Sequence, residues 1–111
     1  MQIVDDLADK VRGKPAPAGS AEGSLKGVDV EAALIKLAAA KNGGGNWRVS
    51  IVDLLKLLGK DSSLAARKVL AAELGVNAGP HGSAEQNIAL HKAVIKAFAD
   101  KGGTVPRGLI Q

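Results

Sequence analysis

Two histidines are the first candidates for chemistry in this sequence of 111 residues, because it contains no cysteine. His81 lies in a turn rich in glycine and proline, and His91 lies within a helical apolar stripe. Neither is followed four residues later by a second histidine, the spacing that places two metal ligands on one helix face. We therefore expect no metal site, and we interpret His91 as a core side chain whose ring bonds to the backbone or to Asn87.

Nucleotide binding and nucleophilic catalysis have no better support in the sequence. The glycine run at 43–45 has no preceding strand and lacks the Lys-Ser/Thr ending of a phosphate-binding loop. The four serines after residue 27 stand where helix caps are expected (Ser50, Ser62, Ser63, Ser83). The prediction is a protein that is not an enzyme and binds no cofactor.

The composition predicts a helical protein. Hydrophobic residues make up 46% of the chain but aromatic residues only 2%, so alanine and leucine must build the core. These two residues favour helices, whereas strands favour β-branched and aromatic side chains. The expected fold is an all-α bundle of four core helices, at 29–41, 50–58, 63–74 and 84–101, within one domain at 28–111.

The boundaries of these helices follow from capping residues. Asp29, Ser50, Ser63 and Ser83 precede apolar runs, and their side chains can accept hydrogen bonds from N–H groups of the first turn. Glycines follow each run and tolerate the left-handed conformation in which helices often end. In the third helix, the apolar spacing predicts that Val69 faces the core.

The first twelve residues predict a short amphipathic helix. An apolar stripe recurs there at helical spacing (Ile3, Val4, Leu7, Val11). Residues 13–27 are rich in glycine, alanine and proline and predict a flexible linker. We therefore expect the helix at 1–12 to be detached and flexibly tethered. Because so short a helix is marginal alone, its stripe must bind its own domain, a second copy or a partner protein.

Trp47 is the only tryptophan, and it adjoins Arg48 before the helix at 50–58. As one of two large aromatic side chains, it is expected to fill the core. The alternative is an exposed anchor for a partner protein, with Arg48 beside it. Together with the apolar stripe of the first helix, these two residues form the predicted partner-binding set.

The basic charge of the chain belongs to the predicted domain. Residues 1–27 carry four acidic and four basic residues, so residues 28–111 carry the whole net charge of +4. The two helices within 51–75 have the spacing of a helix-turn-helix, with polar and basic residues at the start of the second (Ser62, Ser63, Arg67, Lys68). Nucleic-acid binding through these four residues is the alternative function.

No segment of the sequence is predicted to span a membrane, because charged residues interrupt its longest apolar stretches. The acidic start of the chain also differs from the basic start of a secretory signal. We therefore expect a cytoplasmic location.

The sequence from Trp47 onward resembles a bacterial family classed as a domain of unknown function, family 3597. The resemblance rests on two long runs, WRVSIVDLLK at 47–56 and DSSLAARKVLAAELG at 61–75, and on shorter matches around His91 and Gly102-Gly103. It implies a small helical domain with no established activity, and it transfers no catalytic residue. The favoured function is accordingly a non-enzymatic protein-interaction module.

Overall fold

The computed structural model describes residues 3–13, 25–41 and 45–106. The helices in these ranges are α1 (Ile3–Arg12), α2 (Val30–Ala40), α3 (Ile51–Leu57), α4 (Leu64–Leu74) and α5 (Ala84–Asp100). The predicted all-α fold is confirmed. Each of the four expected core helices begins and ends within one residue of its predicted boundary.

The boundaries agree because the caps act locally. The hydroxyls of Ser50 and Ser83 each accept a hydrogen bond at 3.2 Å from the N–H three residues further on. Asp29 and Ser63 cap α2 and α4 in the same way. These four bonds satisfy N–H groups that the first turn of a helix leaves unpaired.

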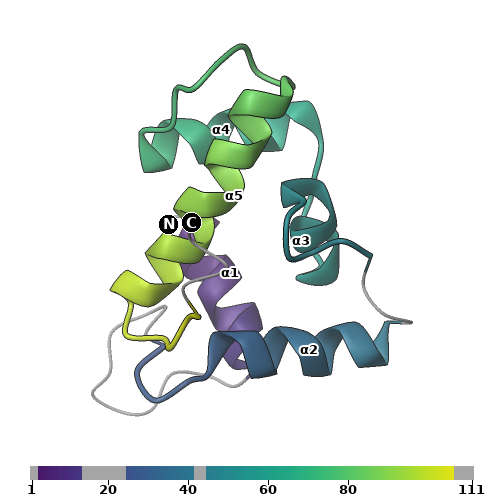
Figure 1. Ribbon diagram of the computed structural model, residues 1–111, viewed down its shortest axis with the longest axis vertical. Coiled ribbons are helices and arrows are strands. Elements are labelled where there is room, and N and C mark those ends of the chain that lie inside the picture. The colour runs from purple at the N-terminus through teal and green to yellow at the C-terminus, as the bar shows by residue number, and fades with distance from the viewer. Residues whose placement is uncertain (1–2, 14–24, 42–44, 107–111) are drawn as a thin grey trace.

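The longest helix, α5, organises the bundle, since it contacts α1, α3 and α4. Figure 1 shows α4 crossing one end of α5 and α2 closing the opposite end of the molecule, where it contacts α1 and α3. The core lies between these helices and is built from fully buried side chains such as Leu34, Leu54, Ile95 and Phe98.

The first helix, α1, is part of this core. Leu7 and Ala8 are fully buried in it. The N–H groups of Ile3 and Val4 donate to the two carboxylate oxygens of Glu73 on α4, at 2.7 and 2.8 Å. A carboxylate at this position satisfies unpaired N–H groups and interacts favourably with the helix dipole. The sequence allowed α1 to pack on its own domain, on a second copy or on a partner. In the structure it packs on its own domain, so the predicted detachment is wrong.

The segment after α5 is joined to the segment before α2 by backbone hydrogen bonds. The Thr104 N–H donates to the Val28 carbonyl at 2.8 Å, and the Leu25 N–H donates to the Lys101 carbonyl at 2.9 Å. Leu25 is also fully buried in the core. It falls within the range 13–27 that was predicted to be a linker, so the folded domain begins earlier than expected. Most of that range lies outside the described residues.

Candidate functional site

Trp47 and His91 are both core side chains, with 4% and 3% of their surfaces exposed. The Nε2 atom of His91 lies 2.8 Å from the Trp47 carbonyl oxygen. Because a carbonyl oxygen can only accept a hydrogen bond, this nitrogen carries the proton. The His91 ring thus holds the segment before α3 against α5, and Asn87 is not its partner.

Burial makes His91 a source of pH dependence. Desolvation lowers its pKa below the ordinary value of 6.5, against the smaller opposing effect of the hydrogen bond to the Trp47 carbonyl. Between the lowered pKa and 6.5, the unfolded chain therefore binds a proton at His91 that the folded protein does not. By proton linkage, the free energy of unfolding is fully retained above that window and falls as the pH decreases through it.

We therefore expect His91→Gln to flatten the acid limb of the stability curve. Glutamine keeps an N–H donor for the Trp47 carbonyl but does not titrate. Thermal unfolding measured between about pH 7 and pH 5 should show a smaller loss of melting temperature for the variant than for the wild type. Equal losses in the two proteins would show that His91 does not carry this dependence.

The apolar stripe predicted to bind a partner is occupied in the structure. Val4, Leu7 and Val11 are buried in the core, and Ile3 packs against it partly buried. Each buried valine or leucine side chain contributes about 1.5–3 kcal/mol relative to exposure. A partner or a second copy could bind these side chains only if α1 left the bundle, at a cost of several such contributions.

Arg48 is the exposed member of the Trp47–Arg48 pair. Its guanidinium carbon lies 4.5 Å from the centroid of the Trp47 ring, a cation–π arrangement. Its Nη1 atom also lies 2.6 Å from Oε2 of Glu31 on α2. The ion pair ties the segment before α3 to α2, and the cation–π contact covers the Trp47 ring within that segment.

The residues predicted to contact nucleic acid lie together at the start of α4, and most of them are engaged within the protein. Ser63 caps α4. Arg67 donates to Oδ1 of Asn87 at 2.8 Å and to the Ser62 carbonyl at 3.2 Å. Lys68 is exposed, and within the described residues no hydrogen bond or ion pair engages it. Of the two cations in the predicted set, Lys68 is the one whose side chain makes no hydrogen bond to the described part of the protein.

The outward face of α4 is mostly apolar. Its exposed residues follow one side of the helix, and we call them the α4 stripe (Leu64, Ala65, Lys68, Val69, Ala72). The exposed fractions of Leu64 and Val69 are 41% and 57%, although both are large hydrophobic residues. The inward orientation predicted for Val69 is wrong, because Leu70 and Ala71 take the buried positions of this turn.

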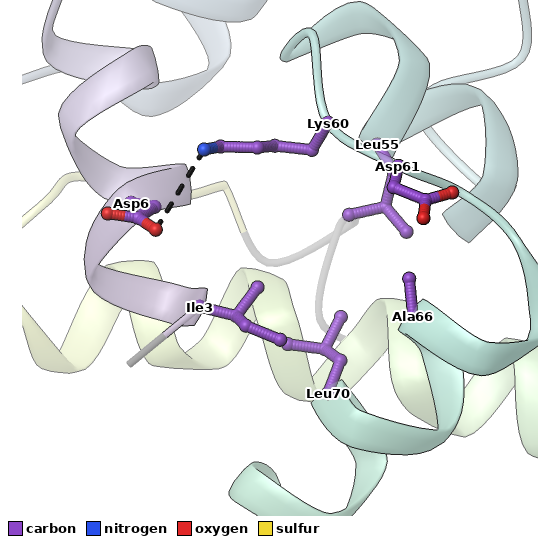
Figure 2. Close-up of a pocket in the computed structure, with 7 residues that line it drawn as sticks. All are labelled: Ile3, Asp6, Leu55, Lys60, Asp61, Ala66 and Leu70. Carbon is purple, nitrogen blue, oxygen red and sulfur yellow. Dashed lines mark ion pairs between the residues drawn. The ribbon is translucent and has the colours of Figure 1, made fainter. Parts of the chain in front are cut away.

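A cavity of about 170 Å³ opens between α1, α4 and the end of α3 (Figure 2). Its walls are apolar and come from all three helices (Ile3, Leu55, Ala66, Leu70). Its charged lining residues are Asp6, Lys60 and Asp61. Of the seven, Ile3 is the one that belongs to the predicted partner-binding set. No local motif could have identified the others, because the cavity joins residues far apart in the chain.

Apart from His91, Gln86 is the buried polar side chain among the described residues, and it holds a turn. Its amide accepts from the Ala78 N–H at 2.7 Å and donates to the Val76 carbonyl at 3.1 Å. No group of three or more potential metal ligands occurs in the part of the chain that the structure describes. Over the same ranges, no helix has the length and apolar character needed to cross a membrane.

Comparisons with known proteins agree with the described fold. The model of a family described as "Domain of unknown function (DUF3597)" matches residues 4–106. The solution structure of a conserved unknown protein from Rhodopseudomonas palustris is 36% identical and has a TM-score of 0.71, and the match covers 98% of each chain. No curated protein matches. The family match begins at residue 4, within α1, whereas the matching runs quoted from the sequence begin at Trp47.

Proposed function

The chain belongs to the DUF3597 family, whose description assigns no activity, and we propose that its domain is a non-enzymatic protein-interaction module. The observation that carries the proposal is the α4 stripe. Its apolar side chains stay exposed along one side of the helix, and an exposed apolar surface of this kind is a common mark of a protein-contact site. Since the stripe of α1 is buried, α4 is the binding surface that we propose in its place.

The position of Lys68 indicates what kind of partner fits this surface. Lys68 lies at the middle of the α4 stripe, with Leu64 and Val69 on either side of it along the helix. Two copies pairing antiparallel through α4 would bring their Lys68 ammonium groups together at the symmetry axis, and like charges oppose this. The partner that fits is an amphipathic helix of another protein, with a carboxylate that faces Lys68.

Affinity capture from a nuclease-treated lysate, with the full chain as bait, tests this proposal. Val69→Asp should lower partner retention about tenfold or more, because it places a charge in the apolar part of the contact. Lys68→Glu should also lower it, by repelling the partner's carboxylate. Ile35→Asp is the matched control, since Ile35 is 46% exposed but lies on α2.

Retention that survives Val69→Asp, or that falls equally in Ile35→Asp, would contradict the proposal. The nucleic-acid alternative has its own signature. It predicts a duplex DNA mobility shift that weakens steeply with salt and disappears in the double variant Arg67→Ala, Lys68→Ala. Such a shift, with no protein retained after nuclease treatment, would replace the interaction-module proposal.

A further inference from the structure

The cavity between α1, α3 and α4 has the size and lining of a small-ligand site. Its volume is about 170 Å³, and its apolar walls include Ile3, Leu55 and Leu70. An apolar cavity of about 150 Å³ in another protein is large enough to hold benzene. A branched aliphatic group of a few carbons therefore fits here. Figure 2 shows these wall side chains converging below the Lys60 side chain.

Two opposite charges stand at the mouth of the cavity and are only loosely paired. The Nζ atom of Lys60 lies 3.8 Å from Oδ2 of Asp6, beyond hydrogen-bond distance. About a third of each side chain is exposed, and among the described residues neither makes a hydrogen bond. Asp61 differs, because its Oδ1 accepts from the Ser63 N–H at 2.8 Å. The mouth thus carries one cation and two anions, and of these three residues Lys60 and Asp6 are the two whose side chains make no hydrogen bond among the described residues.

We propose that this cavity binds a free α-amino acid with an aliphatic side chain, of about the size of leucine. The ligand carboxylate accepts hydrogen bonds from Lys60, the ligand ammonium donates to Asp6, and the side chain lies against the apolar walls. A zwitterion matches a cation and an anion that stand side by side. A simple carboxylate leaves Asp6 without a donor, and a simple amine leaves Lys60 without an acceptor, so each makes one charge-assisted hydrogen bond fewer than the zwitterion.

The site is shared between α1 and the rest of the bundle. Ile3 and Asp6 belong to α1, whereas Lys60 follows α3 and Leu70 belongs to α4. A ligand held between them therefore binds the docked form of α1 better than an undocked form. By linkage, it should stabilise the docking of α1 and slow hydrogen exchange of its amides.

Titration of the full chain with L-leucine, followed by amide chemical shifts, tests the site. We expect shifts to cluster at Ile3, Leu55 and Ala66, which line three sides of the cavity. Lys60→Met and Asp6→Asn each remove one charge-assisted hydrogen bond and should weaken binding about tenfold or more. Lys56→Met is the matched control, because Lys56 is an exposed residue of α3 that does not line the cavity.

Two leucine analogues test the proposed site on the wild-type protein, without any substitution. 4-Methylpentanoate lacks the ammonium and 3-methylbutylamine lacks the carboxylate, so the wild type should bind each about tenfold or more weakly than leucine. Leucine that causes no localised shifts at tens of millimolar would overturn the proposal. Binding of either analogue as tight as that of leucine would overturn it as well, as would unchanged affinity in a folded Lys60→Met variant.

Discussion

Replacing Leu7 by alanine is expected to lower the free energy of unfolding by about 2–5 kcal/mol, the usual cost of such a truncation in a core. The Leu7 side chain is fully buried where α1 joins the common core. A domain of this size typically has a total stability of about 5–15 kcal/mol, so the variant should lose a substantial part of its stability. Urea denaturation monitored by circular dichroism would measure the change.

The Leu7→Ala experiment distinguishes a docked α1 from a detached one. Alanine is a better helix former than leucine, so truncation would not weaken an isolated helix. Ile35→Ala is the control, because this α2 side chain is 46% exposed and its loss should change stability little. A Leu7→Ala variant as stable as the Ile35→Ala control would contradict the position of α1 in the core.

The second large effect is expected for Trp47→Ala, which should cost about 3–5 kcal/mol. The indole is 4% exposed and belongs to the same core cluster as the buried residues of α3 and α5. The hydrogen bond from His91 is made to the backbone carbonyl of Trp47, so the substitution removes packing and leaves that acceptor in place. Denaturant unfolding again gives the measurement.

The neighbouring variant Arg48→Ala supplies the contrast. The Arg48 guanidinium is exposed, and its ion pair with Glu31 and its position over the Trp47 ring are surface contacts. Removing it should cost about 1 kcal/mol or less. A larger loss for Arg48→Ala than for Trp47→Ala would indicate that the tryptophan is an exposed anchor after all.

Leu7 and Trp47 both belong to the set that the sequence predicted to bind a partner. The structure buries both of them in the core of their own domain instead. The spacing of the apolar residues in α1 predicted correctly that one side of this helix is apolar and packs against another surface (Ile3, Val4, Leu7, Val11). It could not say which surface, since an apolar stripe has the same sequence whether it packs on its own domain or on a partner. Val69 was placed inward for a related reason: apolar residues occur on most sides of α4, so their spacing does not single out the buried side.

The proposed binding surfaces were harder still to foresee. The α4 stripe exists because Leu70 and Ala71, rather than Val69, fill the space beside α5 and α1. The cavity proposed to bind an amino acid requires Asp6 and Lys60 to lie close together, although more than fifty positions of the chain separate them. No spacing rule covers such a pair, because periodicity and capping relate residues within one or two helical turns.

The amino-acid sequence was therefore sufficient for the all-α class and for the ends of α2, α3, α4 and α5. Those features depend on contacts between near neighbours, such as the hydroxyl of Ser50 and the N–H of Asp53. The docking of α1, the exposure of Val69 and the cavity were decided by packing between distant segments. Glu73 holds the start of α1 through the Ile3 N–H, 70 positions away, and only the folded chain brings the two together.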